Sequence, residues 1–357
     1  MRLSIASLLI APALAAPACD ASGGASPPAF DDPQVLVAYA DAVVIPTYDR
    51  LAAQAVALDQ AIAALAATPD EAHLALAQSA WVAARVPWEQ SEAFLFGPVE
   101  TFGIDPSIDT WPLNQTDLDA VLASGDALSQ GYVANLPPTQ KGFHTLEYLL
   151  FGQDKGRTAA SLTARELEYL QAIAAEFEDE TARLADAWET GEAGAPPFRT
   201  TFTTAGQAGN SAYPSLAAAG QEVVNGMIGI CDEVANGKIA DPFDARDPLL
   251  EESQFSHNSL QDFQDNIRSV RNGYLGGLDL TAPAATSLSA WVAARDAALD
   301  ADLRAQIEQA IAGIGAIPAP FSAAIVSAGD SASIESAQAH IRTLQATLET
   351  RLLPHFQ

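Results

Sequence analysis

The sequence predicts an all-α fold built from two helical bundles that are related by internal duplication. Alanine and leucine dominate a chain of 357 residues that is 49 % hydrophobic, and both residue types lose little entropy in a helix. Apolar residues recur at helical spacing, and no alternating strand pattern extends beyond a few residues. The heptapeptide SAWVAAR at Ser79–Arg85 recurs at Ser289–Arg295. Seven identical residues, including a tryptophan and an arginine, indicate a duplicated helical unit.

Residues 1–18 are expected to be a signal peptide. Arg2 precedes an uncharged apolar run that is too short to span a bilayer, so cleavage is expected. Cys19 then begins a Ser/Gly/Pro-rich tether over 19–33 and is the expected lipid attachment site. Simple cleavage is the alternative, because lipoprotein signals prefer leucine where Ala16 stands. The mature chain is expected in the periplasm or outer envelope, touching the membrane only through that anchor.

The charge and cysteine content narrow the expected partners and chemistry. The chain has 45 acidic and 17 basic residues and a formal net charge of −28. Such a field repels nucleic acid, which is therefore not an expected partner, and it concentrates cations. Besides Cys19 the chain has only Cys231. No intramolecular disulfide is expected, and Cys231 is interpreted as a small core residue rather than a nucleophile.

The first expected bundle covers residues 34–195. Apolar residues recur at helical spacing from Pro33, and Pro46 should kink or break that helix. A second helix is expected to start at Thr68, an N-cap that is followed by proline and a capping-box glutamate. Another capping box begins at Thr163. The expected helices run over 33–65, 68–96, 116–122, 141–151 and 163–188, with a Pro/Gly/Asp-rich loop over 97–115.

Residues 190–213 are rich in glycine, threonine and alanine and mark the expected boundary between the bundles. The second bundle is expected over residues 210–357. Its helices are expected at 214–237, 257–275, 285–314 and 331–353. The second heptapeptide falls within the third of these helices, as a duplicated helix would. The two halves differ elsewhere, so a functional site need not be duplicated.

His144 and Glu147 are the strongest candidates for a functional centre. Three residues apart on an expected helix, their side chains project from one face. An imidazole and a carboxylate at this separation can bind one metal ion, or one can orient the other. The spacing alone is weak evidence, because His-x-x-Glu is common. A catalytic zinc normally has three protein ligands, so further ligands must come from elsewhere in the chain.

Longer stretches of the chain resemble the imelysin family. The segment Gly142–Gly152, GFHTLEYLLFG, is similar to the Gly-x-His-x-x-Glu signature of that family. Residues 81–98, 105–112 and 252–276 fit the same family, so the resemblance covers most of the mature chain. It implies two helical bundles related by duplication, with the functional site where they meet. It also implies a periplasmic or surface location, often linked to iron acquisition.

The same resemblance guides the choice of further ligands. Glu92, within the family-like segment 88–94, is the first choice for a third ligand. Asp109 is another candidate, with capping of a turn as its alternative role. Glu89 is a third candidate, but it is expected on a solvated helix face. A histidine with several carboxylates would suit a divalent metal, either iron or zinc, and could also hold manganese.

Other family-like residues are expected to line the site. Arg85 and its repeat counterpart Arg295 are expected to pair with carboxylates and hold each bundle together, and Arg85 could also orient Glu147. Ser256 is expected either to cap the helix that follows it or to line the cleft. The expected lining residues are Arg85, Asp109, Gly142, Ser256, Asp262 and Asn266.

Three functions follow from these observations. The leading hypothesis is a non-enzymatic envelope protein that binds a divalent metal through His144, Glu147 and Glu92 and serves iron uptake with envelope transport partners. The second is a metallopeptidase of the imelysin type, in which Glu147 or Glu92 activates a metal-bound water. The sequence lacks His-Glu-x-x-His, and Tyr148 stands where an inverzincin motif has its second histidine. The third is a non-metal binding module for a polymer or protein, in which His144 and Glu147 fix the interface between the bundles.

Overall fold

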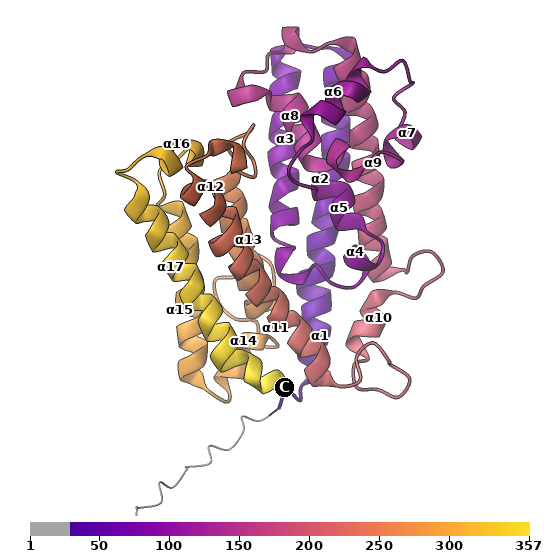
Figure 1. Ribbon diagram of the computed structural model, residues 1–357. Coiled ribbons are helices and arrows are strands. Elements are labelled where there is room, and N and C mark those ends of the chain that lie inside the picture. The colour runs from indigo at the N-terminus through magenta and orange to yellow at the C-terminus, as the bar shows by residue number, and fades with distance from the viewer. Residues whose placement is uncertain (1–28) are drawn as a thin grey trace, which may run out of the picture.

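The computed structural model describes residues 29–357, and these residues form helices and loops without a strand. The all-α prediction is therefore confirmed for this part of the chain. The expected signal peptide and the lipidation site at Cys19 lie outside the described residues. The long helices gather into two sets that lie side by side (Figure 1).

The N-terminal set is built around four helices that pack against one another: α2 (Ile45–Ala67), α3 (Glu71–Glu89), α8 (Gly142–Phe151) and α9 (Ala164–Glu189). The shorter helices are α1 (Pro33–Tyr39), α4 (Pro98–Thr101), α5 (Ile104–Asp109), α6 (Gln115–Ala123), α7 (Gln130–Ala134) and α10 (Phe198–Thr203). Helices α4 and α5 lie in the segment that was expected to be a loop. Large aromatic side chains, among them Trp81, Trp88 and Trp188, fill the interior.

The C-terminal set is also built around four helices: α11 (Leu216–Glu233), α13 (Ser259–Leu275), α15 (Ala297–Gly315) and α17 (Ser331–Thr347). The shorter helices are α12 (Ala240–Ala245), α14 (Leu288–Ala293) and α16 (Phe321–Val326). The four main helices of each set fall within the ranges 34–195 and 210–357 that were expected for two domains, whereas α10 lies between these ranges. Their independence as domains stays a prediction.

Three helices contain a single turn of π-helix: η1 (Ala40–Val44), η6 (Val234–Lys238) and η8 (Leu348–Leu352). The turn η1 lies between α1 and α2, directly before Pro46, the second residue of α2. The expected disturbance at Pro46 thus takes the form of a widened helical turn just before it. Proline has no backbone N–H to donate to the preceding turn, and the π-helical turn occurs where that hydrogen bond is missing. The 3₁₀ turns are η2 (Glu92–Phe94), η3 (Pro138–Gln140), η4 (Gln153–Lys155), η5 (Ala159–Ser161), η7 (Pro248–Leu250) and η9 (Leu353–Phe356).

Helix starts were predicted with mixed success. The capping box of Thr163 and Glu166 is present at the start of α9. Thr68, however, ends α2, and Asp70 caps α3 by accepting a hydrogen bond from the backbone N–H of His73 at 2.9 Å. The prediction that Thr68 is the N-cap of this helix was wrong. Asp70 lies two residues later, and Asp is as good an N-cap as Thr.

The two copies of the heptapeptide have different surroundings. In α3, Trp81 is fully buried and donates a hydrogen bond to the Phe143 carbonyl oxygen at 3.0 Å. In the second copy the helix ends at Ala293, so the continuous helix expected over 285–314 is wrong, and α14 and α15 are separate. Trp291 there donates a hydrogen bond to Asp31 at 3.1 Å. The internal duplication therefore stays a prediction.

Phe30, near the start of the described chain, packs against residues near the C-terminus. The backbone N–H of Phe30 donates a hydrogen bond to the carbonyl oxygen of His355 at 2.8 Å. The ring of Phe30 packs against Trp291 and Phe356, with centroid distances of 5.2 and 4.9 Å. The N-terminal segment thereby becomes part of the C-terminal core.

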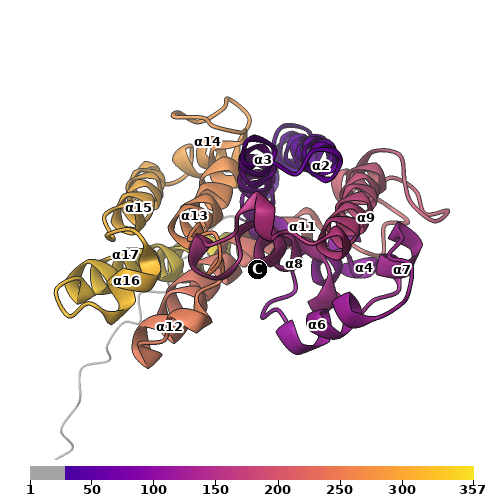
Figure 2. The ribbon, with the colours of Figure 1, turned by 90° about the horizontal axis from the view of Figure 1, so that it is seen from above.

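The two helix sets meet along α3, η2, α11 and α13. Viewed from above, α3 and α13 lie next to each other at the centre of the molecule (Figure 2). Gly226 of α11 permits a very close approach to η2, since a Cβ atom there would lie 2.2 Å from the Ala93 carbonyl oxygen. Gly229, one turn further along α11, has no atom within 4 Å of its would-be Cβ.

This pair of glycines gives a matched test of the packing between the sets. Gly226→Ala should lower the free energy of unfolding by about 1–3 kcal/mol, because the new methyl group forces α11 away from η2. Gly229→Ala should raise it by about 0.5–1 kcal/mol, because alanine loses less backbone entropy in an open helical position. Urea unfolding followed by circular dichroism measures both. Equal effects of the two substitutions would contradict the close contact.

Candidate metal centre

Helix α8 begins where the end of α5 leaves no space for a side chain. Gly142 has a φ of +75°, and a Cβ atom there would lie 2.4 Å from the carbonyl oxygen of Ile108. Only glycine combines this backbone conformation with this approach. The contact explains the glycine of the Gly-x-His-x-x-Glu signature. It brings the first turn of α8, with His144, beside Asp109 at the end of α5.

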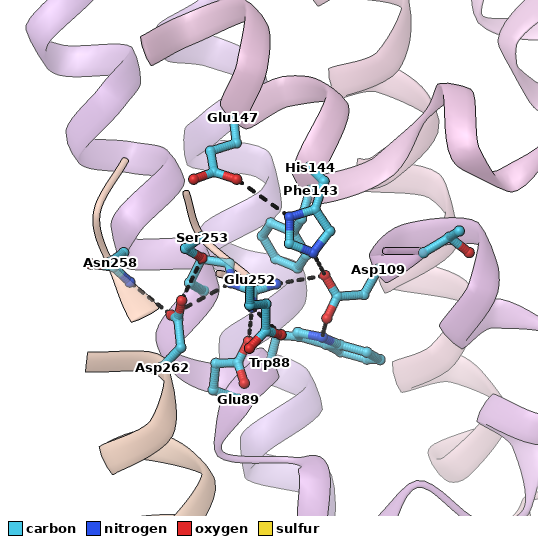
Figure 3. A network of polar contacts seen from close by, with 12 residues as sticks. Trp88, Glu89, Asp109, Phe143, His144, Glu147, Glu252, Ser253, Asn258 and Asp262 are labelled. Atoms are coloured by element: carbon cyan, nitrogen blue, oxygen red, sulfur yellow. Dashed lines mark hydrogen bonds and ion pairs between the residues drawn. The ribbon is translucent and has the colours of Figure 1, made fainter. Parts of the chain in front are cut away.

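The His144 imidazole lies between two carboxylates (Figure 3). Its Nδ1 is 3.3 Å from Oε2 of Glu147, and its Nε2 is 3.2 Å from Oδ1 of Asp109. The side chain is 2 % exposed. Burial alone would lower the pKa of His144, but the contacts with Asp109 and Glu147 outweigh it and raise the pKa to about 9.

Glu147 joins α8 to the C-terminal set. Its Oε1 accepts hydrogen bonds from the backbone N–H groups of Phe255 and Ser256, at 3.1 and 2.8 Å, and from the Ser256 hydroxyl at 2.7 Å. Ser256 therefore does not cap α13, as one alternative expected; the residue at the N-cap position is Asn258. Both oxygens of Glu147 are engaged, one by His144 and one by this loop.

Arg85 is fully buried at the centre of the network. Its Nη1 is 2.6 Å from Asp109, its Nη2 is 3.3 Å from Glu252 and contacts Glu89, and its Nε is 3.6 Å from Asp262. Burial alone would lower the pKa of Arg85, but these four carboxylates raise it well above its usual range. The expected pairing of Arg85 with a carboxylate is therefore found with four partners, two of them in the C-terminal set.

Asp109 contacts three side chains of the site. Its Oδ1 faces both Arg85 and His144, and its Oδ2 accepts a hydrogen bond from the Trp88 indole N–H at 2.5 Å. Burial would raise the pKa of Asp109, but Arg85 and His144 together hold it well below its usual range. Asp109 therefore does more than cap a turn, because it joins Arg85, His144 and Trp88.

A second cation, Lys238, lies at the outer side of the network. Its Nζ is 3.0 Å from Glu252, 3.6 Å from Glu89 and from Glu233, and 3.8 Å from Glu92. Burial raises the pKa of both Glu89 and Glu92 well above the usual range, although Lys238 opposes the shift. The expectation of a solvated Glu89 was wrong: its side chain is fully buried, because the C-terminal set covers this face of α3.

The other predicted lining residues surround the same point. Asp262 accepts hydrogen bonds from the Ser253 hydroxyl at 2.5 Å and the Asn258 side-chain amide at 2.7 Å. Burial raises the pKa of Asp262 to about 6, although Arg85 opposes the shift. The side-chain amide of Asn266 donates a hydrogen bond to Glu89 across the boundary between the sets. The blocks that resembled one family in sequence thus meet in space.

Two groups of side chains bring metal-ligating atoms together. Asp109, His144 and Glu252 each offer one ligand atom, and these atoms lie within 4.8 Å of one another. Within residues 29–357, Glu252 Oε2 has no hydrogen-bond partner and is available to a ligand. His144 Nε2 faces Asp109 Oδ1 at 3.2 Å, a contact that a bound ion would replace. An imidazole with two carboxylates suits zinc, iron or manganese. The residues present therefore fit a divalent metal ion.

The second group consists of Glu89, Glu92 and Asp109. Glu92 thus lies near the predicted centre but groups with Asp109 rather than with His144. Glu252 was not singled out as a ligand by sequence reasoning, although it opens one of the family-like blocks. No local spacing relates Glu252 to His144, and only the packing of the two helix sets brings them together.

Arg85 and Arg295 allow the same residue to be tested in both copies of the heptapeptide. Arg85→Ala should lower the free energy of unfolding by about 3–5 kcal/mol, because it leaves buried carboxylates without their counter-ion. Arg295→Ala should cost about 0.5–1 kcal/mol, because its partner Asp31 is 67 % exposed. Chemical unfolding of the two variants checks this. Similar losses would show that Arg85 is no more important than a surface pair.

Comparison with known proteins relates the whole chain to proteins named for iron regulation. The chain is 32 % identical over 324 residues to iron-regulated protein A of Synechococcus elongatus, covering 91 % of this chain and 86 % of that one. The crystal structure of an iron-regulated protein A precursor from Parabacteroides distasonis superimposes with a TM-score of 0.84 at 31 % identity. That match covers 94 % of this chain and 97 % of the other.

The fold extends to a more distant protein. An imelysin-like protein from Psychrobacter arcticum superimposes with a TM-score of 0.72 at 14 % identity, covering 92 % of this chain and 98 % of that one. At this identity the likeness shows a shared fold. The imelysin family profile, Peptidase_M75, matches residues 44–348, which include every residue of the network described above. This chain therefore belongs to the imelysin family.

Proposed function

We propose that this chain is an exported envelope protein that binds a divalent metal ion between its two helix sets and takes part in iron uptake. The observation that carries the proposal is an excess of buried negative charge at the site. Within residues 29–357, six carboxylates with side chains no more than 10 % exposed share two permanent cations, Arg85 and Lys238, and the titratable His144 imidazole. The six are Glu89, Glu92, Asp109, Glu147, Glu252 and Asp262.

Buried carboxylates must be neutralised, because removing an unpaired charge from water is costly. Protonation is one solution, and the raised pKa values of Glu89 and Glu92 show the pressure toward it. A divalent cation is the other solution. One ion supplies two positive charges and leaves the carboxylates ionised, so that they can bind it. The ligand atoms of Asp109, His144 and Glu252, within 4.8 Å of one another, support this second solution.

The residues have distinct roles in this proposal. His144 Nε2, Asp109 and Glu252 hold the ion. Glu147, predicted as a ligand from the sequence, acts through Nδ1 of His144: it orients the ring, as second carboxylates commonly do at metal-bound histidines. Glu92 supplies charge at the edge of the site and remains a candidate ligand through its group with Asp109.

The link to iron rests on the relatives, two of which are named iron-regulated protein A. Zinc or manganese would suit the same ligands, so iron is preferred on those names. Export is supported by the apolar N-terminal run of the sequence. From residue 29 onward, none of the helices has the length and apolar character needed to cross a bilayer. Membrane attachment would then depend on Cys19, and envelope iron-transport components would be the partners.

A metallopeptidase is the second candidate, because the matched family profile carries a peptidase name and a cavity of about 360 Å³ adjoins the site. Glu147 is a poor candidate for the base that would activate a metal-bound water. Its two oxygens are already engaged by His144 and by three donors of the loop at Phe255 and Ser256. A catalytic base would need at least one free oxygen within hydrogen-bond reach of the metal-bound water.

Calorimetric titration with Fe²⁺ under anaerobic conditions, Zn²⁺ and Mn²⁺ tests the metal site. Wild-type protein should bind one ion, and His144→Ala and Glu252→Gln should each weaken binding on the order of a hundredfold, because each removes a direct ligand. His73→Ala is the matched control, since His73 pairs with Asp70 on the surface and should leave binding unchanged. A folded wild-type protein that binds none of the three ions would reject the metal function.

The peptidase alternative is tested separately by incubating the metal-loaded protein with unfolded protein substrates. The proposed binding function predicts no cleavage above background. Cleavage that a chelator abolishes, and that His144→Ala lacks, would replace the binding function with the enzymatic one. Metal binding without cleavage would support the proposal as stated.

A further inference from the structure

A cavity of about 360 Å³ opens beside the candidate metal centre. Its walls come from both helix sets and carry six carboxylates and a single basic residue, Lys238. The carboxylates are Glu92, Asp105, Asp109, Glu233, Asp241 and Glu252. This volume is well above the roughly 10–15 Å³ that one water molecule needs. It therefore has room for a cation with a hydration shell, and its charge excludes anions.

Lys238 stands between this cavity and the buried network. It is the last residue of the π-helical turn η6, which follows α11. On the buried side its ammonium group contacts Glu252 and Glu89, at 3.0 and 3.6 Å. On the cavity side it contacts Glu233 at 3.6 Å, and the Glu233 side chain is 54 % exposed. Lys238 can thus exchange buried partners for an exposed one without leaving the cavity.

Glu252 is the residue for which a metal ion and Lys238 compete. Its Oε1 accepts a hydrogen bond from Lys238 at 3.0 Å and also contacts Arg85 at 3.3 Å. Its Oε2 has no hydrogen-bond partner in residues 29–357, although Glu252 is only 9 % exposed. A divalent cation bound by Glu252 would repel a lysine ammonium held at the same carboxylate.

We propose that the cavity is the entrance for the metal ion and that Lys238 is a resident counter-ion, which moves from Glu252 to Glu233 when the ion binds. This inference rests on the proposed metal-binding function and adds a path and an exchange step to it. In the metal-free protein Lys238 neutralises part of the buried charge. In the metal-bound protein the ion takes over that task, and Glu233 holds the displaced ammonium group.

Two substitutions should change the metal affinity in opposite directions. Lys238→Met removes the competitor and should tighten binding on the order of tenfold, because the ion no longer has to displace a cation. Glu233→Gln removes the resting place of the ammonium group and should weaken binding on the order of threefold. Titration with Mn²⁺ and Zn²⁺ of the full mature chain measures both changes.

Matched controls carry the same chemical changes away from the cavity. Lys155→Met removes an exposed lysine in η4. Glu308→Gln removes a 60 % exposed glutamate that pairs with Arg271 at 3.9 Å, much as Glu233 pairs with Lys238. Both controls should leave the affinity within twofold of wild type. Equal shifts in the controls would assign the effects to net charge and overturn the exchange.

Stability provides a second readout for Lys238→Met. Without metal this variant should melt at a lower temperature than wild type, because buried carboxylates lose a counter-ion, and saturating Mn²⁺ should remove most of the difference. A purely structural lysine would leave the difference unchanged by metal, which would overturn the proposal. If Lys238→Met does not fold, weaker binding by Glu233→Gln alone supports the exchange, and unchanged binding overturns it.

The outcomes distinguish a failure of the Lys238 exchange from a failure of the proposed metal-binding function. Absence of metal binding by wild type rejects both. Normal binding by wild type, with Lys238→Met and Glu233→Gln unchanged or shifted in the same direction, rejects the exchange and leaves the metal site intact.

Discussion

The structure depends on one buried cation. Arg85 lies near the C-terminal end of α3 with no exposed surface, and its guanidinium group contacts carboxylates from α3, from α5 and from the C-terminal set. An arginine is suited to this role because its planar group offers five donors and does not lose its proton. Since its partners lie up to 177 positions away in the sequence, as 262 is from 85, the group joins segments that no local interaction could bring together.

The carboxylates around Arg85 also determine the chemistry of the candidate site. Carboxylates that are gathered to pair with Arg85 outnumber the cations within reach, and their excess must be balanced by protons, by Lys238 or by a bound ion. The motif helix adds an imidazole to this acidic surrounding, with Glu147 fixing its orientation. The packing of the two helix sets and the proposed metal site therefore depend on the same carboxylates, so a substitution among them should affect both.

The helices could be predicted from the sequence because their signals are local. Alanine-rich apolar periodicity and the Thr163 capping box identify α9. Competing local signals caused the errors: Asp70 displaced Thr68 as a cap, and Asp296 starts α15 where a continuous helix was expected. From spacing alone the candidate site was predictable only on the motif helix, and the family resemblance supplied the lining residues from other segments. Glu252 escaped detection because its partner Arg85 is 167 residues away in sequence, a separation that only tertiary packing closes.

The attachment of Phe30 to the end of the chain has a mechanical consequence. A force applied at residue 29 acts first on the hydrogen bond to His355 and on the packing of Phe30 against Trp291 and Phe356. The load therefore enters the C-terminal set directly, before it reaches α1 and α2. A chain held at its N-terminal end would therefore be held first through this aromatic contact.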